Sequence, residues 1–124
     1  MKIINFNELP EYRIIKCPND GFTSHRGLLK DDNMGYTVCK TVLKPTGRHY
    51  WHYKNHLESC YCVYGKAELT NATTGEKFLI EKDVMYVLDK NDPHYFEVFE
   101  ECMLISIFNP PLTGKELHDK NGSY

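Results

Sequence analysis

The strongest constraint on the fold is a series of short segments that alternate between apolar and polar residues or run apolar. They are rich in Val, Ile, Tyr, Phe and Thr, which suit a pleated sheet. Turn-forming runs separate them. Short strands at spacings of about ten residues predict an all-β sandwich or barrel. Helical signals are few, with one possible turn at residues 7–12 and another at 114–118. The predicted strands span residues 35–43, 58–64, 66–70, 77–80, 85–88, 94–99 and 102–108.

The length of 124 residues predicts a single domain over 1–124, with no internal repeat or linker. Nine Tyr, six Phe and one Trp supply packing material that disordered chains lack. Lys and Arg total 15 against 17 Asp and Glu, so the net charge is −2. A weakly acidic chain without a basic run is a poor partner for nucleic acid or for an anionic membrane.

The N-terminus and the cysteines predict a cytoplasmic protein. Polar residues interrupt the first eight positions, so they cannot form the apolar region of a signal peptide. No segment is long and apolar enough for a membrane span. The five cysteines are an odd number and contain no Cys-x-x-Cys pair, which favours reduced structural thiols.

Strand periodicity indicates which side chains share a face. Alternate residues of a strand point to the same side. Cys39 and Thr41 therefore share one face of their strand, and Ser106 shares a face with Phe108. Glu58 shares a face with the cysteines at positions 60 and 62. If the barrel closes, one of the two faces of each strand lines its interior.

Histidines are the first candidates for chemistry. His49, His52 and His56 lie close together, Glu58 follows them, and His94 comes after a later turn. Imidazole and carboxylate groups from different strands can together bind a metal ion. The spacing resembles the two sequence motifs of a cupin, in which one strand supplies two His and a Glu and another supplies a His.

The match to the first cupin motif is degraded. Lys54 stands two residues after His52, so the usual His-x-His pair before the glutamate is absent. Either the metal is lost or another donor replaces the missing imidazoles. Tyr86 is such a donor, because a phenolate is a hard oxygen ligand suited to iron; the alternative is a core tyrosine. Glu58, Tyr86 and His94 would form an O,O,N triad with open positions.

The C-terminal stretch from residue 108 to 119 is unlike an ordinary tail. It combines two prolines with charged and imidazole groups at defined offsets. We expect it to be ordered and to fold back across the mouth of the barrel, where it can supply polar groups. The alternative is a strap that serves packing alone.

Several motifs together resemble the ectoine synthase family of cupins. They are the run His-Tyr-Lys-Asn-His-Leu-Glu at 52–58, the segment 85–94, the tail 108–124 and the segment 26–35. The resemblance covers residues 20–124. It implies a cupin barrel of the jelly-roll type, usually a homodimer, that binds iron. It also implies an enzyme, a hydro-lyase that closes N4-acetyl-L-2,4-diaminobutyrate into ectoine, a compatible solute, with loss of water.

The resemblance also implies roles for individual residues. The family's ligands for ferrous iron, or another divalent metal, correspond to Glu58, Tyr86 and His94. Tyr53 and Glu116 are the candidates for proton transfer. Arg26 with Thr41 would hold the substrate carboxylate, because a guanidinium matches that group in fork geometry. The positions implied for substrate binding are Phe22, Arg26, Cys39, Thr41, Ser106, Phe108 and His118.

Three substrate-binding positions depart from the family pattern. Phe22 stands where the family has Trp, Cys39 where it has His or Asn, and Ser106 where it has Cys. These changes fit either tuning within one activity or a related substrate. Two rival classes therefore stay open: a metal-dependent cyclase or hydrolase for another acyl-diamino acid or a glutamine-like compound, and a non-catalytic cupin that binds a small molecule.

Overall fold

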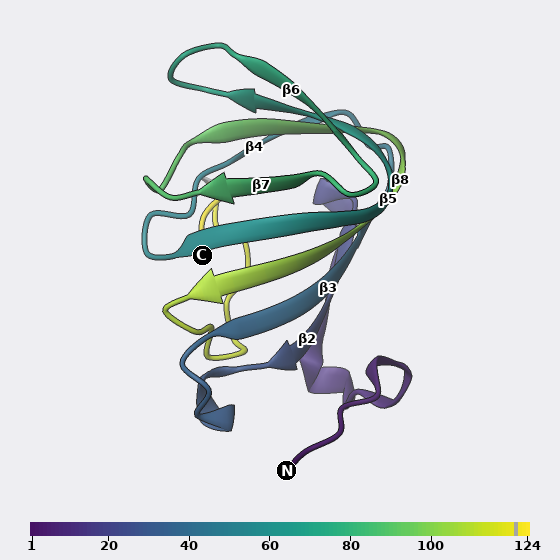
Figure 1. Ribbon diagram of the computed structural model, residues 1–124, viewed down its shortest axis with the longest axis vertical. Coiled ribbons are helices and arrows are strands. Elements are labelled where there is room, and N and C mark those ends of the chain that lie inside the picture. The colour runs from purple at the N-terminus through teal and green to yellow at the C-terminus, as the bar shows by residue number, and fades with distance from the viewer. Residues whose placement is uncertain (121) are drawn as a thin grey trace.

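The computed structural model describes residues 1–120 and 122–124, which form an eight-stranded antiparallel sheet curled into a barrel (Figure 1). The strand order is β1-β2-β3-β8-β5-β6, with β4 paired to β8 and β7 paired to β5. The predicted all-β class is therefore confirmed. The strands are β1 (Ile14–Cys17), β2 (Phe22–Leu28), β3 (Thr37–Leu43), β4 (Arg48–Trp51), β5 (Leu57–Asn71), β6 (Lys77–Glu81), β7 (Met85–Leu88) and β8 (His94–Asn109).

Two long strands, β5 and β8, pair with each other along the barrel. Each unites two segments that the sequence analysis treats as separate strands. β5 bends at Gly65, where the register with β8 shifts. Gly65 has a φ of +98°, and a Cβ there would lie 2.2 Å from the Glu101 carbonyl oxygen. Only glycine fits this bend, because any side chain would meet both left-handed strain and the neighbouring backbone.

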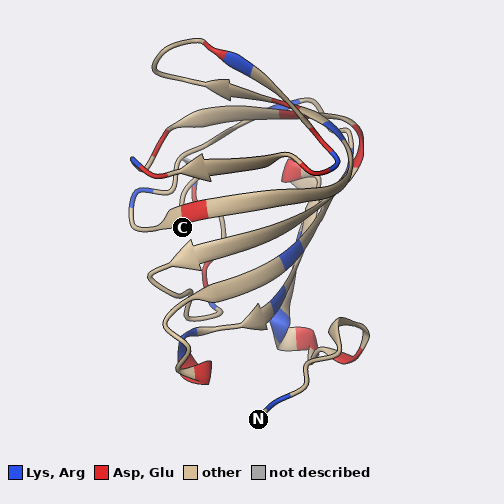
Figure 2. Ribbon diagram, viewed as in Figure 1, with Lys and Arg blue, Asp and Glu red and all other residues tan. Residues whose placement is uncertain are grey.

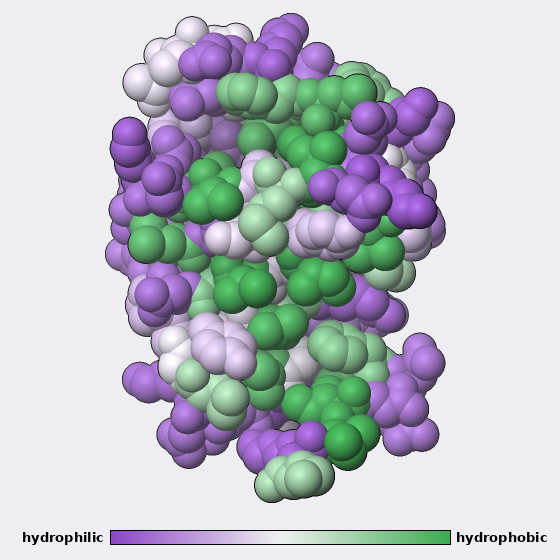
Figure 3. All heavy atoms as spheres, in the orientation of Figure 1, coloured by the Kyte–Doolittle hydropathy of each residue, from purple (hydrophilic) through white to green (hydrophobic). Residues whose placement is uncertain are grey.

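The interior follows the predicted alternation. Glu58, Cys60 and Cys62 on β5 are buried, as are Ser106 and Phe108 on β8. All five cysteines are free thiols. The outer face over β5, β7 and β8 carries a band of apolar side chains (Figure 3). Its exposed members include Leu57, Tyr61, Met85, Val87 and Ile107.

Three strands, β1, β2 and β4, are absent from the sequence prediction. β2 shows why, because it turns polar residues inward: Ser24 and Arg26 are buried while Thr23 and His25 are less so. A strand whose inward face is polar has no hydrophobic period to detect. Charged residues of both signs lie mostly in loops and at strand ends (Figure 2).

Among the described residues, the helical content is limited to short 3-10 turns: η1 (Phe6–Glu8), η2 (Glu11–Arg13), η3 (Pro18–Asp20) and η4 (Lys30–Asp32). The first two fall where one turn is expected. The turn expected at residues 114–118 is wrong. There the Glu116 carboxylate accepts hydrogen bonds from the Thr113 and Gly114 backbone N–H groups, and Gly114 has a φ of +105°. No helix among the described residues is long and apolar enough to cross a membrane.

The tail after β8 folds back over the barrel, which confirms the ordered C-terminal stretch (yellow in Figure 1). The Leu112 backbone N–H donates to the Thr37 hydroxyl at 2.7 Å, and its carbonyl accepts from Lys30 N–H at 2.7 Å. The Leu112 side chain is completely buried. Farther on, His52 N–H donates to the Gly122 carbonyl at 2.9 Å. Hydrogen bonds thus attach the tail to the barrel at two places, near Thr37 and Lys30 and again at His52.

Asp32 holds the N-terminal segment against this structure. Its carboxylate accepts from the Leu29 backbone N–H at 2.9 Å, from the Arg13 guanidinium at 3.0 Å and from the Lys2 ammonium at 3.0 Å. The Leu29 hydrogen bond, followed by the Arg13 guanidinium, lowers the pKa of Asp32 well below its ordinary value. The ionised carboxylate is therefore the form that stabilises the fold.

We predict that Asp32→Asn lowers the free energy of unfolding by about 1–3 kcal/mol near neutral pH, because charge-assisted hydrogen bonds are lost. The folded-state pKa lies below the unfolded value of about 3.9. The contribution is therefore present above that pH and lost as the pH falls through the folded-state pKa. Urea unfolding at several pH values should show the two proteins converging in acid. Asp31→Asn, a change at the exposed neighbour, is the control; an undiminished difference in acid would contradict the assignment.

Candidate active site

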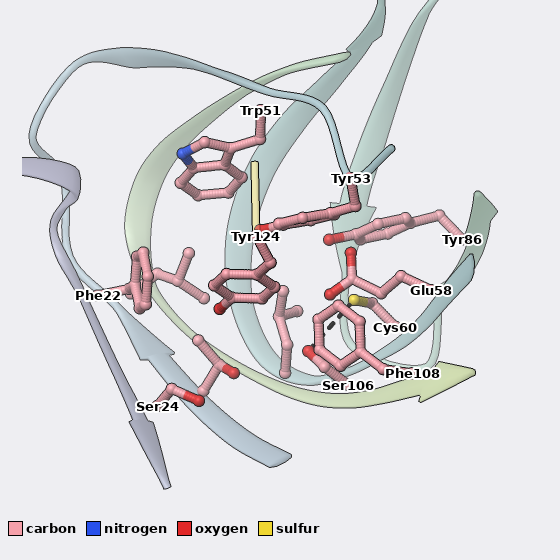
Figure 4. Close-up of a pocket in the computed structure, with 13 residues that line it drawn as sticks. Phe22, Ser24, Trp51, Tyr53, Glu58, Cys60, Tyr86, Ser106, Phe108 and Tyr124 are labelled. Carbon is pink, nitrogen blue, oxygen red and sulfur yellow. Dashed lines mark hydrogen bonds between the residues drawn. The ribbon is translucent and has the colours of Figure 1, made fainter. Parts of the chain in front are cut away.

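A narrow cavity opens into the barrel interior, between β2, β3, β5, β7, β8 and the tail (Figure 4). Its volume is about 30 Å³, which is room for about two water molecules. A larger ligand therefore needs one of the lining groups to move. The lining residues are Phe22, Ser24, Thr41, Leu43, Trp51, Tyr53, Glu58, Cys60, Tyr86, Leu104, Ser106, Phe108 and Tyr124.

Glu58 and Tyr86 come from adjacent strands and meet on the cavity wall. On β5 and β7, Cys60 pairs with Tyr86, so Glu58 lies two residues along the same inward face. The Tyr86 hydroxyl points toward the Glu58 carboxylate (Figure 4). Burial raises the pKa of Glu58 to about 8, and it also raises the pKa of Tyr86. Burial thus keeps two neighbouring acidic groups neutral, and a cation bound beside them would favour loss of their protons.

His94, at the start of β8, is oriented as a metal ligand would be. Its Nδ1 donates to the Asp92 carbonyl at 2.9 Å, which leaves the lone pair on Nε2. That Nε2 is buried and has no hydrogen-bond partner. Burial lowers the pKa of His94 to about 4, so the ring is neutral at physiological pH. An unpartnered imidazole nitrogen in a buried position fits a metal ion.

Glu58, Tyr86 and His94 are the residues to which the sequence analysis assigns a mixed oxygen and nitrogen donor set. The described residues contain no group of three His, Cys, Asp or Glu side chains that could hold a metal. A metal bound by Glu58 and His94 would need a donor of another kind, such as the Tyr86 oxygen. Ser106 lies beside this set, with its hydroxyl 3.3 Å from the Cys60 sulfur.

Aromatic rings form the opposite wall. Phe22 meets Trp51 edge to face at a centroid distance of 6.0 Å, and it meets His118 at 5.0 Å. Phe22, which stands where the family has Trp, is joined on this wall by the indole of Trp51, from β4 rather than β2. Two strands thus supply the aromatic surface here.

Arg26 lies behind this wall and does not line the cavity. It is completely buried, and its Nη2 donates to the Glu116 carbonyl at 2.7 Å. Its guanidinium carbon lies 5.5 Å from the centre of the Tyr124 ring, which itself lines the cavity. The Arg26 Nε and Nη1 have no hydrogen-bond partner. If Tyr124 withdraws, a buried cation with free donors faces the interior, beside Thr41 on the cavity wall.

The Glu116 carboxylate is hydrogen bonded to the backbone of the tail itself. Its carboxylate accepts from the N–H groups of Thr113 and Gly114 at 2.7 and 2.9 Å, and lies 4.0 Å from Arg26 Nη1. Burial acts to raise its pKa, but the backbone hydrogen bonds outweigh it and the pKa is lowered. Glu116 is therefore ionised, and in this arrangement it closes the tail turn and neutralises Arg26.

Tyr53 begins a chain of hydrogen bonds that leads out of the cavity. Its hydroxyl lies 2.7 Å from His118 Nε2, and His118 Nδ1 lies 2.8 Å from the Asp20 carboxylate. Burial raises the pKa of Tyr53 and lowers that of His118. The sequence analysis singles out the first two residues but misses Asp20, which belongs to a short turn 98 positions from His118.

The predicted site residues thus form two shells. Seven line the cavity: Phe22, Thr41, Tyr53, Glu58, Tyr86, Ser106 and Phe108. Five lie directly behind it: Arg26, Cys39, His94, Glu116 and His118. Strand periodicity could have found Leu43 and Leu104, since each lies two residues from a predicted member on a predicted strand; Ser24 lies on β2, which the sequence analysis missed.

Comparisons with known proteins identify the family of this chain. A sequence model of the family described as ectoine synthase matches residues 1–124. An L-ectoine synthase from Wolinella succinogenes is 46% identical over 112 residues, which cover 90% of this chain and 86% of that protein.

Solved structures give the same result. The crystal structure of ectoine synthase from P. lautus superposes with a TM-score of 0.88 at 33% identity, covering 98% of this chain and 87% of that one. A cupin domain of a transcriptional regulator from Enterobacter cloacae superposes with a TM-score of 0.59 at 15% identity, covering 73% and 98%. The latter shows the fold alone, a cupin barrel. The chain therefore belongs to the ectoine synthase family and is an enzyme of the hydro-lyase class.

Proposed function

We propose that this chain closes N4-acetyl-L-2,4-diaminobutyrate into ectoine, with loss of water, at an iron site formed by Glu58, Tyr86 and His94. The observation that carries the proposal is the buried, unpartnered Nε2 of His94 together with a neutralised carboxyl and a phenol from neighbouring strands. When bound, a divalent metal supplies Lewis acidity, which makes an unreactive amide carbonyl electrophilic.

The protein's own groups then have two tasks, to curl the substrate and to move protons. Arg26 and Thr41 hold the carboxylate, and Phe22 and Phe108 pack against the carbon chain. Holding a flexible molecule in the reacting shape can remove up to about 7–11 kcal/mol of an entropic barrier. The closed barrel excludes bulk water, which favours a dehydration.

Substrate binding requires the tail to open and close. A cavity of about 30 Å³ is too small for the precursor while the Tyr124 ring forms part of its lining. Withdrawal of Tyr124 exposes the free donors of Arg26. We propose that the substrate carboxylate takes up these donors, and that the tail then closes over the bound molecule.

Proton transfer falls to Tyr53 and Glu116. The Tyr53 hydroxyl is on the cavity wall and is hydrogen bonded to His118. It can accept a proton from the attacking amine and return one to the departing oxygen. Glu116 is tied into the tail turn, so it takes part only after that turn rearranges.

We further propose that the protein works in the cytoplasm as a homodimer. Its five thiols are all free, which suits a reducing compartment. The exposed apolar side chains over β5, β7 and β8 (Figure 3) offer a surface for a second copy. The second candidate function is ring closure of a related acyl-diamino acid, which the altered residues at Phe22, Cys39 and Ser106 favour.

For the metal site, we predict that Glu58→Ala or His94→Ala lowers iron affinity by more than about 100-fold, since even outer partners of metal ligands contribute about 10–100-fold. Turnover of N4-acetyl-diaminobutyrate should be lost with the metal. Tyr86→Phe removes only the oxygen donor and should weaken iron without unfolding the barrel. Elemental analysis, circular dichroism and an anaerobic turnover assay are the measurements. His25→Ala, a histidine outside the donor set, is the control; full iron content in all three variants would overturn the site.

For the tail, we predict that a chain ending after Gly114 folds but turns over at least about 100-fold more slowly, because it lacks Glu116, His118 and Tyr124. The cut must follow Leu112, which is part of the core. Leu117→Ala, a change at an exposed tail side chain, should leave turnover unaltered. Normal turnover by the shortened chain would show that the tail serves packing alone.

For substrate choice, we predict that Cys39→Asn with Ser106→Cys lowers the KM for N4-acetyl-diaminobutyrate. A restored polar partner contributes about 1–3 kcal/mol, or about 5–150-fold in affinity. Phe22→Trp is made separately, because Trp51 already occupies the neighbouring space and overpacking costs about 1–3 kcal/mol. A KM unchanged in the double variant would show that these positions do not select the substrate.

A further inference from the structure

Asp20 is a carboxylate that nothing in the proposed reaction uses, yet it is in contact with the site. It ends the η3 turn and precedes Gly21, whose left-handed φ of 73° leads the chain into β2. One carboxylate oxygen lies 2.8 Å from His118 Nδ1. The His118 side chain is 4% exposed, whereas that of Asp20 is 29% exposed. Asp20 thus joins a buried imidazole to the protein surface.

The contact determines the tautomer of His118. An ionised carboxylate only accepts hydrogen bonds, so Nδ1 must carry the proton. Burial lowers the pKa of His118, although Asp20 opposes this, and the resting ring is neutral. Its Nε2 then has a lone pair, which accepts from the Tyr53 hydroxyl at 2.7 Å. The chain of hydrogen bonds therefore runs in one direction, from Tyr53 through His118 to Asp20.

The other groups around His118 cannot replace this carboxylate. The rings of Phe22, Trp51, Tyr53 and Tyr124 pack against the imidazole. The charge of Asp119 raises the pKa of His118, whereas the charge of Arg26 lowers it. Asp20 also lies 3.7 Å from His49 Nδ1, a separation too long for a hydrogen bond. Asp20 is thus the carboxylate that the described structure sets against the His118 nitrogen.

We infer that Asp20 is a positioning residue that enables Tyr53 to act as a base, an inference that rests on the proposed ring closure. As the substrate amine gives its proton to the Tyr53 oxygen, the phenolic proton of Tyr53 moves to His118 Nε2. The resulting imidazolium lies against the Asp20 carboxylate, which stabilises it. Once the nitrogen has bonded to the amide carbon, it passes its second proton to the former carbonyl oxygen, which becomes a hydroxyl. In the dehydration, His118 returns the first proton to Tyr53, and Tyr53 gives it to this hydroxyl, which leaves as water as the C–N double bond forms. Tyr53 and His118 are then in the same protonation states as at the start.

The test is Asp20→Asn, which keeps the shape of the side chain but removes its charge and adds a competing donor. We expect kcat to fall at least about tenfold, as for a weakened acid–base group, with KM altered less than about twofold. Asp20→Glu should restore part of kcat. Asp31→Asn, a change at an exposed aspartate outside this chain of bonds, is the matched control and should leave both constants unaltered.

Nitrogen NMR of His118 in the full chain, without added iron, tests the inference independently of turnover. The wild-type ring should carry its proton on Nδ1, and Asp20→Asn should shift the population toward Nε2–H. An Nε2–H ring in the wild type would overturn the inference. The inference would also be overturned if Asp20→Asn raised KM and made the tail easier to proteolyse but left kcat unaltered. That result would mean that Asp20 only holds the tail in place. The predicted tautomer without any turnover of the precursor would instead overturn the proposed reaction and keep the role of Asp20 in orienting His118.

Discussion

The antiparallel pairing of β5 with β8 is the interaction on which the rest of the structure depends. Its register sets Glu58 beside Phe108 and Cys60 beside Ser106, so one pair of strands supplies much of the cavity wall. A slip of one residue would turn these side chains outward. The bend at Gly65 allows both strands to continue around the barrel, where β8 also pairs with β4. The site and the fold therefore share the same hydrogen bonds.

Burial inside this barrel controls the chemistry of the candidate metal residues. The same low-polarity interior raises the pKa of Glu58 to about 8 and lowers that of His94 to about 4. Both residues are uncharged when nothing balances them. In the proposed function, a bound cation would reverse the preference of the carboxyl and the phenol, and it would satisfy the free nitrogen of His94.

The tail converts an open barrel into a closed one. It is tied to the barrel by backbone and hydroxyl hydrogen bonds at Leu112 and Gly122, and it carries the rings that narrow the cavity. The contact between His118 and Asp20 joins this tail to the turn before β2. In the proposed function, closure of the tail therefore also aligns the groups assigned to proton transfer.

Strand periodicity is local and repeats every two residues, so sequence alone was enough to predict the all-β class, the extent of β7 and which residues share a face on β3, β5 and β8. The sequence also named Glu58, Tyr86 and His94 through motif spacing and family resemblance. It missed β2, whose inward face is polar. The folded chain was needed to show that Trp51 shares the wall with Phe22, that Tyr124 lines the cavity and that Asp20 contacts His118. These contacts join residues far apart in the chain through the curvature of the barrel and the path of the tail, and no local pattern records either.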